Sequence, residues 1–181
     1  RFADARADEA HRLYPPEGDP RRREVDALEA DFDAVLGPDT RRFAYHHVLA
    51  DRALSFAIAA SSPAVERALA RMSFPLVRAG MRRGMQIDEA HVAESVVRID
   101  ETFDAVAARL SDGRRFLAGD RFTTADLTFA ALAGPIVLPA EHPIAQPGLS
   151  AYPQDARAAF SRWRAHRAGQ FALHLYATER R

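Results

Sequence analysis

Apolar residues along this chain recur mainly at intervals of three and four, which is the spacing of one face of an α-helix. The clearest run steps by four, three, four, three and four through Val92, Val96, Ile99, Phe103, Val106 and Leu110. No segment alternates apolar and polar residues over a length typical of a strand. The pattern therefore predicts an all-α, compact multi-helix bundle.

Proline and glycine divide the first third of the chain into helices. Asp19 followed by Pro20 is typical of an N-cap and a first helical position. Gly37-Pro38 is expected to end that helix, because proline removes a backbone donor and restricts its predecessor. The next helix is then expected to start near Asp39 or Thr40 and to run to Ile58.

Similar signals divide the rest. A fourth helix is expected from Pro63, with a kink at Pro75 inside it. The last helical stretch is expected to begin near Gln154, to break near Gly169 and to resume as far as Tyr176.

One helix start carries a complete capping signature. Thr123 fits an N-cap, and Asp126 stands three residues later, where its carboxylate can bond back. Phe122 and Leu127 occupy the two positions of a hydrophobic staple around them. The helix that follows, from Thr124 to about Val137, is almost wholly apolar and is therefore expected to be central and buried. We interpret all four residues as structural.

The amino-acid composition limits the kinds of binding and catalysis that these residues can perform. The 181 residues are 48% hydrophobic, enough for a real core, and 25 basic and 25 acidic groups cancel. This neutrality argues against nonspecific nucleic-acid binding. Absence of cysteine excludes disulfides, thiolate nucleophiles and cysteine-ligated zinc, and absence of lysine excludes a Schiff base within these residues.

Targeting signals are not evident either. The longest apolar run, 127–140, contains two prolines and is shorter than the roughly 20 residues that span a bilayer. The first residues lack the apolar core of a signal peptide. We therefore expect a cytoplasmic protein without a membrane or nucleic-acid partner. Because the sequence begins at Arg1 and not at methionine, we expect it to start inside a longer protein.

The segment Arg115 to Leu127 resembles a family signature. It reads Arg-Phe-Leu-Ala-Gly-Asp-Arg-Phe-Thr-Thr-Ala-Asp-Leu, and it is similar to the capping-box region in the C-terminal helical domain of glutathione S-transferases. Every position of the aromatic-Leu-x-Gly-Asp and Phe-Ser/Thr-x-Ala-Asp-Ile/Leu patterns is matched. Two further segments extend the likeness: Leu13-Tyr14-Pro15 resembles the family's interdomain linker, and residues 19–58 resemble its opening helical hairpin.

This resemblance implies a domain organisation. Residues 1–18 would be the remnant of the last thioredoxin-like helix plus the linker, and residues 19–181 the C-terminal helical domain. It also implies a bacterial-type enzyme that joins the glutathione thiolate to a small apolar electrophile. Glutathione would be a co-substrate held mainly by the thioredoxin-like domain, which these residues do not include, so no catalytic residue is assigned here.

The same resemblance implies a homodimer without a metal, in which this chain supplies the electrophile-pocket wall and dimer surface. An alternative is a non-catalytic helical protein-interaction module of the same type. An all-α transcriptional regulator is disfavoured, because no basic N-terminal helix-turn-helix is present.

Within the family, the third helix lines the electrophile pocket. The candidates there are Phe43, Tyr45, His46 and Leu49, of which Tyr45 or His46 would donate a hydrogen bond to the substrate. The competing interpretation is that they are ordinary packed aromatic and aliphatic residues. His46 and its neighbour His47 point about 100° apart around a helix, so they should not chelate one metal.

An arginine stripe on the fourth helix is the remaining feature, formed by Arg67, Arg71, Arg78 and Arg82. It would either attract an anionic substrate or form a solvated face, and we favour the solvated face. Met72 and Leu76 lie opposite the stripe and are expected to be core residues.

Overall fold

The computed structural model describes residues 12–58, 64–144 and 146–179, with residues 56–58 and 64–72 described by their backbone alone. Helices dominate these residues, which contain no β-strand and one isolated bridge between Phe116 and Gly119. The all-α prediction is confirmed. None of the described helices combines the length and apolar character needed to span a membrane.

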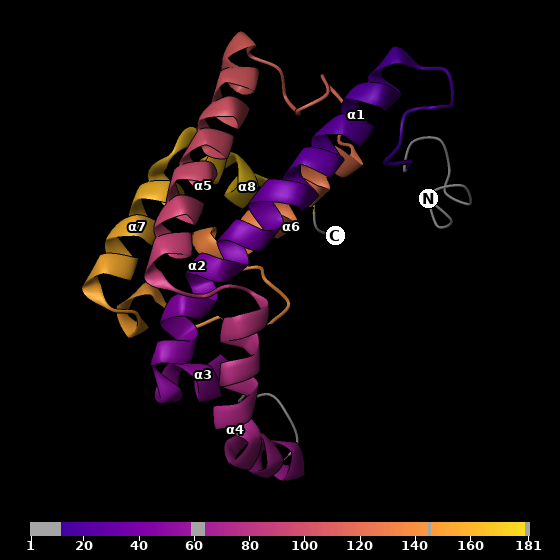
Figure 1. Ribbon diagram of the computed structural model, residues 1–181. Helices are drawn as coiled ribbons and strands as arrows, with labels where there is room; N and C mark the ends of the chain where they lie inside the picture. The colour runs from indigo at the N-terminus through magenta and orange to yellow at the C-terminus, as the bar shows by residue number, and fades with distance from the viewer. Residues whose placement is uncertain (1–11, 59–63, 145, 180–181) are drawn as a thin grey trace.

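The helices follow one another along the chain with short connections (Figure 1). They are α1 Pro20–Asp31, α2 Gly37–Ala50, α3 Arg52–Ile58, α4 Ala64–Gly84, α5 Glu89–Arg109, α6 Thr124–Val137, α7 Gln154–Ala165 and α8 Arg167–Thr178. A π-helical turn, Phe32–Leu36, and two 3-10 turns, Leu110–Asp112 and Leu149–Ala151, complete them.

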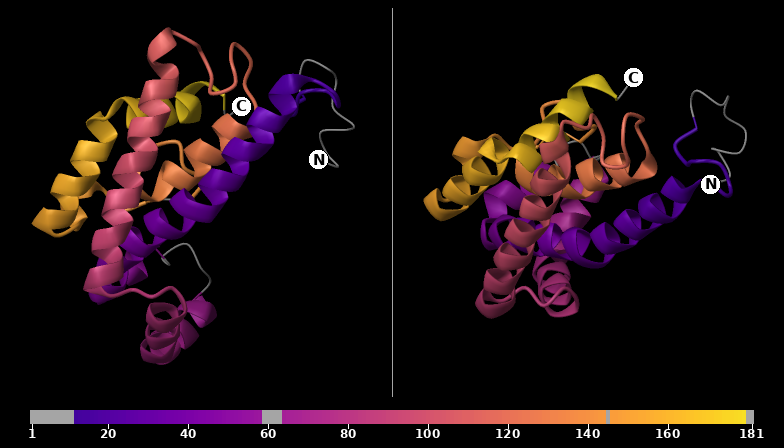
Figure 2. Two further views of the ribbon diagram at one scale, coloured as in Figure 1. Left: turned by 45° about the horizontal axis from the view of Figure 1, so that its top comes forward. Right: turned by 90° about the horizontal axis from the view of Figure 1, so that it is seen from above.

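Helix α6 is the centre of the bundle, as its apolar sequence predicts. It packs against α1, α2, α7 and α8 and runs alongside α1 (Figures 1 and 2). Its residues Phe129, Ala133, Ile136 and Val137 have no exposed surface. Phe129 contacts the rings of Phe32 and Phe103, so one side chain joins three helical segments.

A buried carboxylate fixes the start of α6. Asp126 Oδ2 accepts hydrogen bonds from the backbone N–H of Thr123 at 2.9 Å and from its hydroxyl at 2.8 Å, within a complete capping box. Asp126 Oδ1 accepts a third from the N–H of Leu117 at 2.7 Å. Burial raises the pKa of Asp126, and the hydrogen bonds oppose this rise without cancelling it. The carboxylate thus ties α6 to the preceding loop.

The predicted staple residues lie on either side of this cap. The ring of Phe122 packs on Phe116, with ring centroids 5.7 Å apart, while Leu127 is 46% exposed. Both residues line one cavity, which is described below.

Gly37-Pro38 does not end a helix, so this prediction was wrong. The chain continues from α1 into α2 through the π-helical turn, in which the N–H of Gly37 donates to the carbonyl of Phe32, five residues back. This wider turn relieves the clash that proline causes with a normal helical turn. Asp39 and Thr40 therefore lie inside the long helix, and the Thr40 hydroxyl donates to the carbonyl of Leu132 on α6 at 2.8 Å.

Two helix breaks also differ from the prediction. The third helix is interrupted at Asp51, whose carboxylate accepts from the N–H of Ala53 at 2.7 Å and starts α3. The last break is at His166 and not at Gly169. Gly169 is needed for another reason: a Cβ there would lie 1.9 Å from the carbonyl oxygen of Trp163, so only glycine permits this close approach of α8 to α7.

Helices α2 and α5 are joined by an ion cluster around the buried Asp39. Its carboxylate accepts from Arg98 at 2.7 and 2.8 Å, from Arg42 at 2.7 Å and from the Ser95 hydroxyl at 2.8 Å. Burial alone would raise the pKa of Asp39, but these bonds and the two positive charges hold it below its usual value. Arg98 also reaches Glu94, one turn earlier on α5, at 3.5 Å.

Helix α4 lies outside the bundle and projects below it in Figure 1. It continues through Pro75, while Pro63, the predicted start, lies outside the described residues. Leu76 is 79% exposed, so its prediction as a core residue was wrong. Its apolar spacing is helical, but no other element packs over it.

The proposed domain boundary near residue 18 stays a prediction. Residues 1–11, which carry most of the suggested thioredoxin-like remnant, lie outside the described residues. The linker-like segment after them is anchored to the bundle. The carbonyl of Leu13 accepts from the N–H of Thr124 at 3.1 Å, and the Tyr14 hydroxyl donates to Glu29 at 2.8 Å.

Asp126→Ala should destabilise the protein by roughly 2–4 kcal/mol, because it leaves the buried N–H groups of Leu117 and Thr123 without an acceptor. Asp88→Ala removes the exposed N-cap of α5 and should cost only about 0.5–2 kcal/mol. Chemical denaturation of both variants beside the parent measures the difference. Equal losses for the two would contradict the special role given to Asp126.

Candidate functional site

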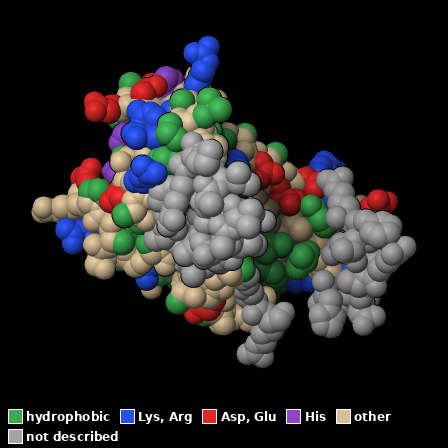
Figure 3. Space-filling model, turned by 90° about the horizontal axis from the view of Figure 1, so that it is seen from below, with side chains coloured by type: hydrophobic (Ala, Val, Ile, Leu, Met, Phe, Trp, Pro, Cys, Tyr) green, Lys and Arg blue, Asp and Glu red, His purple; other side chains and the backbone are tan. Residues whose placement is uncertain are grey.

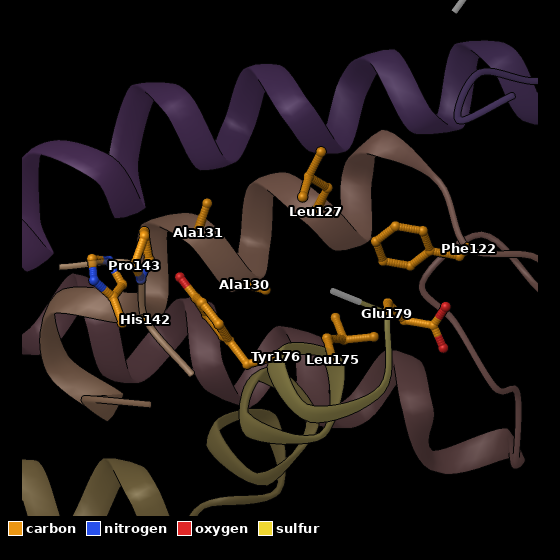
Figure 4. Close-up of a pocket in the computed structure, with 9 residues that line it drawn as sticks. All are labelled: Phe122, Leu127, Ala130, Ala131, His142, Pro143, Leu175, Tyr176 and Glu179. Carbon is orange, nitrogen blue, oxygen red and sulfur yellow. The ribbon is translucent and has the colours of Figure 1, made fainter. Parts of the chain in front are cut away.

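The principal candidate site is an apolar cavity of about 390 Å³ between α6 and α8 (Figure 4). Phe122 lies where α6 begins, and His142 and Pro143 lie at the opposite end, on the loop after α6. Leu175 and Tyr176 reach toward α6 from α8. The full lining is Phe122, Leu127, Ala130, Ala131, His142, Pro143, Leu175, Tyr176 and Glu179.

Small residues on α6 create this space. Ala130 and Ala131 are consecutive alanines of α6, and both line the cavity. Gly134 follows one turn later, and a Cβ there would lie only 2.9 Å from the Tyr176 hydroxyl oxygen. Any side chain at this position would therefore displace Tyr176. The sequence of α6 sets both the empty volume and the position of the tyrosine.

Three of the lining side chains are polar. The rings of His142 and Tyr176 lie with their centroids 6.1 Å apart at one end, and Glu179 lies nearer Phe122. His142 Nδ1 lies 3.2 Å from the N–H nitrogen and 3.0 Å from the carbonyl oxygen of Ile144, so the loop backbone holds the ring. A small apolar molecule with one polar group would match this arrangement of apolar walls and polar ends.

Two of the four residues that the sequence places at a pocket are core residues. Phe43 is 4% exposed, and its ring packs against those of His47, Phe160 and Trp163 at 4.8, 5.4 and 4.8 Å. Leu49 is also buried. Neither lines any of the four cavities described for this structure, so a pocket role for them stays a prediction. The ring of Phe43 is enclosed by Phe160 and Trp163 of α7.

Tyr45 and His46 are half-buried. Tyr45 lines a second cavity, of about 190 Å³, together with Tyr152, Gln146 and other residues of the loop after α6. His46 lines no described cavity; its Nδ1 is buried without a hydrogen-bond partner, and its ring meets that of His47 edge-on at 5.0 Å. The structure therefore does not bring the four candidates together, and a substrate contact for Tyr45 stays a prediction.

Most of the α6–α8 cavity was missed from the sequence. Phe122 and Leu127 were singled out, but for capping, and His142 and Tyr176 received no site role. The consecutive alanines of α6 are the one signal that could have indicated an opening. The partners across it come from segments distant in the sequence, so their proximity depends on the tertiary fold.

A metal site was also sought among the side chains in the described part of the chain. No group of three or more histidine, aspartate and glutamate side chains lies where it could hold a metal ion. The pair His91 and Asp88 is close, with His91 Nδ1 2.8 Å from a carboxylate oxygen, but it closes the start of α5 at an exposed position.

Comparison with known proteins gives one match. Residues 89–169 match the family model described as "Glutathione S-transferase, C-terminal domain". This segment runs from the start of α5 into α8 and includes the capping box, so the resemblance drawn from that motif is confirmed. No curated protein and no solved structure gives a significant match.

His47 should make stability depend on pH. Burial, followed by the neighbouring His46, lowers the pKa of His47 below its usual value of 6.5, while Asp155 opposes the shift. The neutral form therefore favours folding, and this contribution is present above pH 6.5 and lost as the pH falls below it. Denaturation at pH 7.5 and 5.5 should show a smaller acid-induced loss for His47→Phe than for the parent.

His174→Phe serves as the matched control, because His174 is exposed on α8. It should keep the parent's dependence on pH. If His47→Phe and His174→Phe lost stability equally on acidification, the burial of His47 would not be the cause.

Proposed function

Because residues 89–169 match the family model of the C-terminal glutathione S-transferase domain, we propose that this protein conjugates glutathione to a small apolar electrophile. The observation that carries the proposal is the α6–α8 cavity, whose walls are mainly apolar. Its volume of about 390 Å³ falls in the range of small-molecule sites, roughly 300–1,000 Å³. In this proposal the cavity binds the electrophile, and glutathione is held mainly by a thioredoxin-like domain.

The chemistry requires a second domain for a physical reason. A thiol pKa falls when the thiolate meets a hydrogen-bond donor, a cation or a free helix N-terminus. The N-terminus of α6 lies beside the cavity, but its N–H groups already have partners: the N–H of Thr124 donates to the carbonyl of Leu13, and the Thr123 side chain accepts from the N–H of Asp126. We therefore assign no catalytic residue within this chain. The same family resemblance supports a bacterial-type, cytoplasmic homodimer, whose oligomeric state light scattering would measure.

A non-catalytic helical interaction module remains the second candidate. It is favoured by the mainly apolar walls of the cavity, which can bind a ligand or a partner without transforming it. Turnover of an electrophile by the protein together with a thioredoxin-like domain separates the two functions. Conjugation supports the transferase, and its complete absence in a folded two-domain protein supports the module.

Filling the cavity should abolish binding of an apolar ligand. Ala131 is exposed at the cavity wall, so Ala131→Trp adds bulk there without entering the core. We expect the Kd for a naphthalene-sized fluorescent probe, 1-aminonaphthalene, to rise at least tenfold, measured by fluorescence titration. Ala158→Trp makes the same change on the exposed face of α7, away from every described cavity, and should leave the Kd unchanged.

Glutathione itself should not bind to residues 1–181 alone. The described part of the chain offers a largely apolar cavity and no set of side chains matched to a charged tripeptide. Isothermal titration calorimetry of the 181-residue chain with glutathione should give no saturable heat. Stoichiometric binding would contradict the division of roles between the two domains.

A further inference from the structure

Helix α4 exposes apolar side chains that the bundle does not cover. Leu76 is 79% exposed and Val77 48% exposed, and they stand 100° apart, so a broad arc of the helix is apolar and open. Among the residues that the structure describes, no neighbouring element packs along α4 to the extent that the other helices pack on one another. An uncovered apolar helix is marginal in water, because helices in proteins are stabilised mainly by packing of their apolar face.

The charge of α4 is as unusual as its exposure. Its 21 residues contain five arginines and one glutamate, a net charge of +4 in a chain that is neutral as a whole. From residue 67 to residue 87 no acidic side chain interrupts the arginines. Figure 3 shows arginine and hydrophobic side chains lying side by side on the face seen from below. The helix is therefore both basic and amphipathic.

This charge argues against a second copy of α4 as the covering partner. Two copies would bring two helices of charge +4 together, and only Glu66 on each would offset the repulsion. An anionic surface instead gains from every arginine. Each basic residue close to an anionic leaflet strengthens binding by about fivefold.

We propose that α4 is a docking element for an anionic lipid surface. Leu76 and Val77 enter the boundary between headgroups and acyl chains, and the arginines, most of which lie on the polar face of the helix, add the attraction to anionic lipids. The helix lies on the surface and does not cross it, so the lack of a spanning helix does not bear on this contact. Helix α4 projects from the other helices (Figure 1), and none of the residues that line the α6–α8 cavity lies on it.

This inference goes beyond the proposed function and revises the sequence-based expectation of no membrane partner. That expectation rested on the absence of a spanning segment and of a signal peptide. Surface binding needs neither, since it depends on apolar area and on attraction between unlike charges.

Vesicle flotation tests the proposal with the whole 181-residue chain. The protein should float with phosphatidylglycerol vesicles in 50 mM salt, should not float with phosphatidylcholine vesicles, and should lose most of its binding in about 500 mM salt, where charges are screened. Leu76→Glu should weaken binding to phosphatidylglycerol at least tenfold. Val97→Glu makes the same kind of change at an exposed position on α5, where Val97 is 55% exposed, and should bind as the parent does.

A second measurement tests whether α4 itself contacts the lipid. The chain has a single tryptophan, Trp163, which is buried, so Leu76→Trp adds one reporter. Its emission should shift to shorter wavelength with phosphatidylglycerol vesicles alone. Absence of binding to phosphatidylglycerol would overturn the proposal, as would equal binding of the two glutamate variants. Self-association that Leu76→Glu abolishes, without vesicle binding, would assign α4 to a second copy.

Discussion

The buried carboxylate of Asp126 is the constraint on which the arrangement of the bundle depends. It accepts hydrogen bonds from the backbone N–H of Thr123, the N-cap of α6, and from the N–H of Leu117, at a position with no access to water. A buried charge is costly, and the rise in the pKa of Asp126 reflects that cost. The helix that it anchors then provides the surface against which α1, α2, α7 and α8 pack.

A second polar cluster fixes the position of the long helix that runs through α1 and α2 against α5 and α6. Asp39 joins it to α5 through Arg98 and Ser95, and Thr40 joins it to α6 through the carbonyl of Leu132. These contacts explain why the chain remains helical across Gly37-Pro38: both polar residues find their partners only when they face inward. Local propensity favours a break there, and the tertiary contacts outweigh it.

Helix α6 contributes both to the core and to the cavity on which the proposed function rests. Its alanines and Gly134 leave room beside α8, so the central helix of the core also forms one wall of the cavity. Helix α4 has the opposite character, because its residues Leu76 and Val77 are exposed. The described residues thus contain a bundle with an apolar cavity and a basic helix that projects from it.

Local features of the fold follow from the amino-acid sequence alone. Residues close together in the sequence predict the capping box, the extent of α6 and the apolar face of α5, and the structure has all three. The family resemblance also rests on a short segment, and the family model confirms it. Features that depend on contacts between residues far apart in the sequence are visible only in the folded structure. Packing buries Phe43 and Leu49. The last helix break lies at His166. Tyr176 lies close to Gly134 and His142, which are distant from it in the sequence. The physical reason is that periodicity states which face of a helix is apolar, whereas only packing decides whether another helix, a ligand or a surface covers that face.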